Sequence, residues 1–114
     1  MDPGDGRYMT DKFVVLVTCG SEKEAVRLGR AVVAARLAAC ANIHSAPVRS
    51  IYHWKGKVEE AREWMVLLKT TRKRFPALRA AIQKLHTYDV PEIIALPIAE
   101  GSSKYLQWLR DSVK

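Results

Sequence analysis

Hydrophobic and polar residues alternate from Pro47 to Trp54, which predicts a β-strand, and the chain turns back directly afterwards. Lys55-Gly56 offers a tight turn there, because glycine readily adopts a positive φ. The returning segment, Lys57 to Thr70, would reach about 46 Å if fully extended at roughly 3.3 Å per residue. A compact chain of this length is only about 35 Å across. The returning arm therefore either breaks at a bulge near Glu59-Glu60-Ala61 or carries the hairpin beyond its own domain.

A hairpin that extends beyond its own domain would leave large apolar side chains without cover. Ile51, Tyr52, Trp54 and Trp64 all lie on its two arms. Exposed apolar groups of this size mark surfaces that a partner covers. The hairpin is thus the first indication of an obligate oligomer.

The other strand and helix patterns predict a mixed α+β fold. The first half of the chain predicts a strand at 13–18, a helix from the capping box Ser21/Glu24 to about Ala38, and a strand from 41–43 that Pro47 interrupts before the hairpin. After the hairpin, a helix begins at about Arg72, and its apolar stripe is Phe75, Leu78, Ile82 and Leu85. A strand at 90–98 and a short helix from 101 to 111 complete the chain. This β-α-β-β-α-β order with a C-terminal helix predicts a ferredoxin-like sandwich, in which two helices cover one face of a four-stranded antiparallel sheet.

Length and composition suit one globular domain. The chain has 114 residues, 48% of them hydrophobic, which is enough for a core. We expect residues 1–11 to be a disordered tail and residues 12–114 to form the domain. No apolar run approaches the roughly 18 residues of a membrane span, and the start lacks the features of a secretory signal, so we expect a cytoplasmic protein without a membrane partner. In that compartment Cys19 and Cys40 are expected to be small buried hydrophobes.

The net charge of +7 permits binding to nucleic acids or acidic partners. However, the basic residues are spread along the chain, and the densest cluster is only Arg72-Lys73-Arg74. No strand combines basic and aromatic residues in the way that RNA-binding sheets do. A solvated basic face is therefore the favoured interpretation, and a nucleic-acid partner is not expected.

Five ordered motifs resemble the CutA family of divalent-cation-tolerance proteins, over nearly the whole stretch from Phe13 to Val113. They are Arg36-Leu37-Ala38-Ala39-Cys40-Ala41-Asn42-Ile43, Ser50-Ile51-Tyr52-His53-Trp54-Lys55-Gly56-Lys57-Val58, Lys69-Thr70, His86-Thr87-Tyr88-Asp89-Val90-Pro91-Glu92-Ile93-Ile94 and Tyr105-Leu106-Gln107-Trp108-Leu109. The resemblance implies a homotrimer in which long hairpins join the sheets of neighbouring subunits. Such strand pairing would satisfy edge backbone groups that a single protomer leaves open.

The resemblance also implies a ligand pocket between subunits, with polar and aromatic groups from Trp54, Glu63, Lys69, Tyr88 and Glu92. For a copper or other divalent metal ion, the candidate ligands are His86, Cys19 and Glu92. A soft thiolate with an imidazole suits copper, and the carboxylate tolerates harder ions. The chain departs from the family pattern at Thr87, where a proline is usual, and Cys19 lies two residues beyond the position of the first-strand thiol in some bacterial relatives.

These features lead to two hypotheses about function. The first is a trimeric cytosolic protein of divalent-metal tolerance that binds copper, another divalent cation or a small ligand at an intersubunit cleft. The alternative is a small-molecule signalling trimer of the nitrogen-regulatory PII type, in which Lys69, Glu63 and Tyr88 would hold an organic anion. No segment resembles a nucleophile elbow or a phosphate loop, so neither an enzyme nor an organic cofactor is expected.

Overall fold

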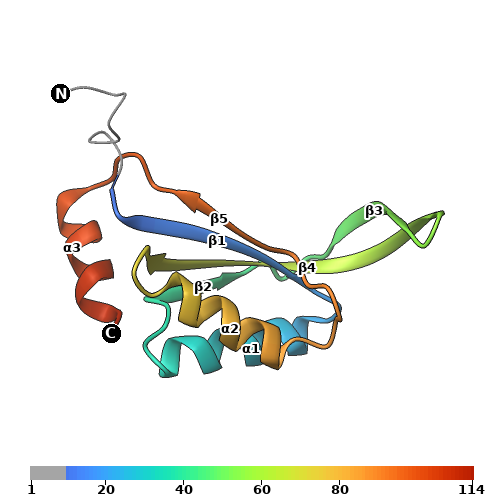
Figure 1. The fold of residues 1–114 in the computed structure, drawn as a ribbon, viewed down its shortest axis with the longest axis horizontal. Coiled ribbons are helices and arrows are strands. Elements are labelled where there is room, and N and C mark those ends of the chain that lie inside the picture. Colours follow the sequence, from blue (N-terminus) through green and yellow to red (C-terminus); the bar gives the residue numbers. More distant parts are fainter. Residues whose placement is uncertain (1–9) are drawn as a thin grey trace.

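Eight helices and strands follow one another in the computed structural model, which describes residues 10–114 as a mixed α+β fold (Figure 1). They are β1 (Lys12–Cys19), α1 (Glu22–Ala34), β2 (Cys40–Ile43), β3 (Val48–Trp54), β4 (Lys57–Thr71), α2 (Phe75–Leu85), β5 (Ile93–Pro97) and α3 (Ser103–Ser112). The predicted order is confirmed, except that the second strand is divided into β2 and β3 at the segment containing Pro47.

Strand β4 organises the sheet, because two different sets of strands pair with its two halves. Its C-terminal half, from Trp64 to Thr71, pairs with β1, and part of it pairs with β2. Its N-terminal half, from Lys57 to Glu63, pairs with β3. The main sheet has the order β2-β4-β1-β5, and every pairing is antiparallel.

The hairpin of β3 and β4 extends beyond the body of the molecule (Figure 1). Strand β4 is continuous over 15 residues, and its register with β3 is unbroken from Val48↔Glu63 to Trp54↔Lys57. The bulge considered near residues 59–61 is therefore not present, and the longest extent of the fold is 47 Å. Lys55 and Gly56 both have positive φ, 50° and 80°, as a type I′ turn requires.

The core lies between one face of the sheet and helices α1 and α2, both of which cover that face (Figure 1). Strands β1 and β4 contribute fully buried side chains to it, including Val15, Val17, Val66 and Leu68, and the helices contribute Leu28, Val32, Leu78 and Ile82. The predicted stripe of α2 is wrong at its last position, since Leu85 is exposed at the end of the helix, and α2 begins at Phe75 rather than Arg72. None of the helices in residues 10–114 has the length and apolarity that a membrane span needs.

Helix α1 ends earlier than the predicted Ala38, because the chain forms a Schellman turn after Ala34. The Leu37 amide donates to the Val32 carbonyl at 3.0 Å, and the Arg36 amide donates to the Val33 carbonyl at 3.0 Å. The turn requires a left-handed residue, and that residue is Arg36, with φ of 62°. A side chain with a Cβ is strained in this conformation.

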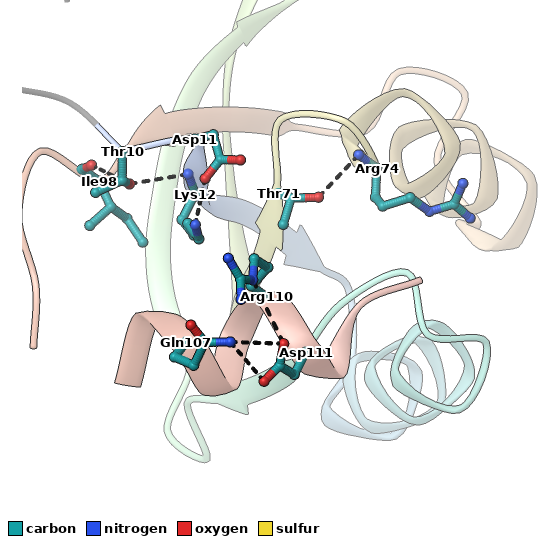
Figure 2. A network of polar contacts seen from close by, with 9 residues as sticks. All are labelled: Thr10, Asp11, Lys12, Thr71, Arg74, Ile98, Gln107, Arg110 and Asp111. Atoms are coloured by element: carbon teal, nitrogen blue, oxygen red, sulfur yellow. Dashed lines mark hydrogen bonds and ion pairs between the residues drawn. The ribbon is translucent and has the colours of Figure 1, made fainter. Parts of the chain in front are cut away.

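The first described residues lie at the end of the sheet opposite the hairpin (Figure 1), where polar contacts hold them in place (Figure 2). Thr10 donates to the Ile98 carbonyl from its amide and its hydroxyl, and the Arg72 amide donates to the Asp11 carbonyl at 2.7 Å. The hydrogen bond from the Lys12 side chain lowers the pKa of Asp11 and outweighs burial, which acts in the opposite sense. Thr10 and Asp11 thus belong to the ordered domain although they fall in the predicted tail, whose residues 1–9 lie outside the described residues.

We predict that Arg36→Gly stabilises the protein by about 1 kcal/mol, because glycine removes the steric cost of the left-handed position. The measurement is the free energy of unfolding from urea denaturation. Arg36→Ala is the matched control, since it loses the same guanidinium contact with the Ser112 carbonyl but keeps a Cβ. Equal stability of the two variants would contradict the strain at Arg36.

Candidate functional site

A pocket of about 540 Å³ lies at the base of the hairpin, where β4 changes its partner strand. Glu63 is the last residue of β4 that pairs with β3, and Trp64 is the first that pairs with β1. Figure 1 shows the connection from α2 to β5 passing beside this point. The pocket is lined by Thr18, Ser50, Ile51, Tyr52, Trp54, Glu63, Tyr88, Asp89, Val90 and Glu92.

The strand period explains which hairpin side chains meet at this pocket. Ser50, Tyr52 and Trp54 alternate along β3 and therefore share one face. Glu63 pairs with Val48 in the register of β4, so its side chain lies on that same face. Thr18 comes from the end of β1, and the residues from Tyr88 to Glu92 come from the connection before β5. Three segments far apart in the sequence thus form one site.

The charged groups that line the pocket are all acidic. Glu63, Asp89 and Glu92 contribute carboxylates, and none of the lining residues is a lysine or an arginine. Within residues 10–114, none of these three carboxylates forms a salt bridge. A chain with a net charge of +7 therefore has a locally negative pocket, which favours cations over anions.

Glu63 and Thr18 lie at the buried side of the pocket, with 9% and 7% of their surface exposed. The Tyr88 hydroxyl donates to Glu63 Oε2 at 3.1 Å, whereas Glu63 Oε1 accepts no hydrogen bond from any described residue. Burial, and then this hydrogen bond to Glu63, raises the pKa of Tyr88, so the phenol keeps its proton. The Thr18 hydroxyl has no hydrogen-bond partner among the described residues, although the residue lines the pocket. Glu63 Oε1 and the Thr18 hydroxyl therefore retain hydrogen-bonding capacity toward the pocket, although both residues are largely buried.

His86 lies behind Tyr88 and supports it. Its ring is 4.7 Å from the Tyr88 ring between centroids. Its Nε2 donates to the Thr18 carbonyl at 2.7 Å, and its Nδ1 accepts from the Tyr88 amide at 3.1 Å. This pattern assigns the proton to Nε2 and uses both ring nitrogens. His86 therefore has no free lone pair for a metal ion in this structure.

Glu24 fixes the connection that carries Tyr88. Its N-cap bond is confirmed, since the Glu24 amide donates to Ser21 Oγ at 3.1 Å. Its carboxylate, however, does not complete the predicted capping box but accepts from the Gly20 amide at 3.2 Å and the Thr87 amide at 2.9 Å. Burial alone would raise the pKa of Glu24, but the hydrogen bonds from Thr87 and Gly20 outweigh burial and lower it. The carboxylate thus holds α1, the end of β1 and the pocket wall together.

The predicted metal ligands are not brought together. Glu92 lines the pocket, but Cys19 and His86 do not. Burial, and then the charges of Glu24 and Glu63, raises the pKa of the Cys19 thiol to about 12, which keeps it protonated and makes it a poor ligand. Among residues 10–114, no three His, Cys, Asp or Glu side chains converge closely enough to hold a metal ion. Cys19, His86 and Glu92 therefore do not fit a shared copper site within one chain.

Four of the five predicted pocket residues do line one cavity: Trp54, Glu63, Tyr88 and Glu92. Lys69 does not line it. It lies six residues further along β4, about 20 Å in an extended strand, where its ammonium donates to Asn42 Oδ1. Sequence reasoning missed Thr18, Tyr52 and Asp89 as lining residues. The strand period would have placed Tyr52 beside Trp54, but the approach of Thr18 depends on long-range pairing.

We predict that Glu24→Gln lowers the free energy of unfolding by about 1–2 kcal/mol at pH 7, because buried charge-assisted hydrogen bonds are weakened. The folded state holds the pKa of Glu24 below its ordinary 4.5. The contribution of the carboxylate is therefore complete above that pH and is lost as the pH falls through the lower folded value. Urea unfolding at several pH values should show the gap between wild type and variant closing in acid. Glu22→Gln, at an exposed position in the same helical turn, is the control, and a gap that does not change with pH would refute the assignment.

Comparison with known proteins agrees with the motifs. A family model described as CutA1 divalent ion tolerance protein matches residues 13–112. The divalent-cation tolerance protein CutA of Thermus thermophilus is 50% identical over 99 residues, which is 87% of this chain and 95% of that one. Protein CutA of Homo sapiens is 44% identical over 109 residues, which is 96% of this chain but 60% of the human protein, so the chain spans less than two thirds of that relative. A solved structure of the Thermus thermophilus protein has a TM-score of 0.88 at 48% identity, and the match covers 90% of this chain and 99% of that chain. The chain belongs to the CutA1 divalent ion tolerance family.

Proposed function

We propose that this chain is a non-enzymatic protein of divalent-cation tolerance, which acts as a homotrimer and binds a cation in the pocket at the base of the hairpin. The observation that carries the proposal is the set of three carboxylates, Glu63, Asp89 and Glu92, that surround one pocket without a neutralising lysine or arginine in the lining. Family membership supports the link to divalent cations. The cytoplasmic location stays a prediction from the sequence.

The chemistry of the pocket favours hard cations over copper. Carboxylates suit ions such as Mg²⁺ and Mn²⁺, whereas copper prefers the imidazole and thiolate ligands that His86 and Cys19 do not offer here. Since three of these side chains do not converge on one point within residues 10–114, the proposed cation retains much of its hydration shell, as Mg²⁺ commonly does. Glu63, Asp89 and Glu92 would then accept hydrogen bonds from its water molecules.

The alternative of an organic anion receives little support from this geometry. It required Lys69 to lie with Glu63 and Tyr88, but Lys69 lies elsewhere on β4 and bonds Asn42. An anion in the pocket would meet three carboxylates. It is unfavourable to remove an anion from water and place it beside groups of the same charge.

The surface of the hairpin supports the trimer. Ile51 and Val58 are 65% and 67% exposed, and within residues 10–114 strand β3 pairs with β4 alone. Its free edge can therefore accept another strand. A second apolar area lies on the sheet face away from α1 and α2, where β5 exposes Ile94 and Leu96. A neighbouring copy would cover these surfaces, as the resemblance to the family implies.

We predict that Mn²⁺ and Mg²⁺ bind to the full chain in calorimetric titrations, and that Glu92→Gln and Asp89→Asn each weaken binding by roughly two- to fivefold. Glu59→Gln is the matched control, because Glu59 is an exposed hairpin carboxylate outside the pocket. Succinate serves as an anion probe. Binding of succinate, or metal affinities unchanged in the Asp89/Glu92 double variant, would contradict a cation site.

We also predict a solution mass near three times the 12.9 kDa of one chain in light scattering. Ile51→Lys should lower that mass, because a charge at this exposed apolar position is costly to bury against a neighbouring copy. Leu85→Lys, at an exposed apolar position on α2, should leave the mass unchanged. A single-chain mass for wild type would refute the assembly, and equal masses for wild type and Ile51→Lys would remove the hairpin from the interface.

A further inference from the structure

The walls of the pocket contain more apolar surface than a hydrated metal ion can use. The aromatic residues Tyr52, Trp54 and Tyr88 line it together with the aliphatic residue Val90. A hard divalent ion interacts with oxygen atoms and gains nothing from aliphatic groups. The combination of aromatic faces and carboxylates is typical of sites for organic cations, which are stabilised by both.

The size of the pocket also favours an organic cation over a hydrated metal ion. Six water molecules around one ion occupy about 180 Å³, at roughly 30 Å³ each. The pocket measures about 540 Å³, which lies within the range of small-molecule sites. The pocket therefore has room for about three times the volume of the six water molecules around one ion.

The unused hydrogen-bonding groups indicate which organic cation fits. Glu63 Oε1 and the Thr18 hydroxyl accept no hydrogen bond from described residues at the buried side of the pocket. A primary ammonium has N–H donors for both, whereas a quaternary ammonium has none. Asp89 and Glu92 supply further carboxylates at exposed positions of the same pocket, so a second ammonium can be neutralised there.

We propose that the pocket binds a linear aliphatic polyamine. One terminal ammonium donates to Glu63 and Thr18, the methylene chain lies against Tyr52 and Trp54, and a second ammonium pairs with Asp89 and Glu92. The inference rests on the proposed cation preference of this pocket, and it adds the class of the organic ligand. Polyamines and divalent metal ions would compete for the same carboxylates.

The test is calorimetric titration of the full-length protein with spermidine at constant ionic strength, repeated in the presence of MgCl₂ and compared with tetramethylammonium chloride. We expect one spermidine per chain, a weaker apparent affinity with Mg²⁺ present, and little binding of tetramethylammonium. Thr18→Val, which keeps the shape of the side chain, and Glu92→Gln should each reduce spermidine affinity by roughly tenfold, the scale of one charge-assisted hydrogen bond.

Trp54→Leu and Trp108→Leu form a matched pair, because both residues are 46% exposed and, of the two, Trp54 alone lines this pocket. Only Trp54→Leu should weaken spermidine binding. Light scattering and circular dichroism establish whether each variant keeps its mass and fold. If Trp54→Leu loses either, the loss of spermidine affinity in Thr18→Val tests the proposal instead.

The outcomes separate the two proposals. If Mn²⁺ or Mg²⁺ binds and spermidine does not, the polyamine inference is wrong while the proposed cation site stands. If neither binds, both are wrong. If spermidine binds equally well to wild type, Thr18→Val and Glu92→Gln, it associates as a general counterion and the inference is likewise overturned.

Discussion

The structure depends on one strand, β4, that is longer than the sheet to which it belongs. Its C-terminal half lies between β1 and β2 and buries Val66 and Leu68 in the core. Among residues 10–114, its N-terminal half pairs with β3 alone, and a two-stranded ribbon is marginally stable by itself. The half of β4 in the main sheet anchors one end of the ribbon, and the type I′ turn at Lys55-Gly56 closes the other end. Because Glu63 is the last residue paired with β3, the change of partner strand also places a carboxylate at the buried side of the pocket.

A continuous set of polar contacts connects helix α1 to this pocket. Glu24 binds the Thr87 amide, His86 binds the Thr18 carbonyl and the Tyr88 amide, and Tyr88 binds Glu63. Buried polar groups are costly unless they are paired, so each contact constrains the next. Gly20 permits the close approach, because a Cβ there would lie 3.1 Å from the Tyr88 hydroxyl. The shape of the pocket thus depends on Glu24, a residue that does not line it.

Local patterns predicted the elements and the hairpin turn, because each depends on near neighbours in the sequence. The pocket residues Trp54, Glu63, Tyr88 and Glu92 were instead predicted from the resemblance to the CutA family. The period of two in β3 identifies one face, and the Ser21 cap identifies the start of α1. The helix ends were harder to predict from the sequence. Helix α1 ends in a Schellman turn that uses Arg36 rather than the usual glycine, so no residue type in the sequence indicated the turn. The roles of His86 and Cys19 were beyond local reasoning. Their types suggest metal ligands, but long-range packing uses the imidazole nitrogens of His86 and buries the Cys19 thiol.

The charge of the whole chain and the charge of its pocket have opposite signs, and the local arrangement decides what can bind. The chain carries 19 basic and 12 acidic residues, which by itself favours anionic partners. At physiological ionic strength, however, exposed charges are largely screened beyond about 8 Å. A ligand inside the pocket is therefore governed by Glu63, Asp89 and Glu92, whose attraction is screened least where Glu63 is buried. Net charge predicts where ions gather around this protein, whereas the register of β3 on β4 and the connection before β5 determine the sign of the charge that lines the pocket.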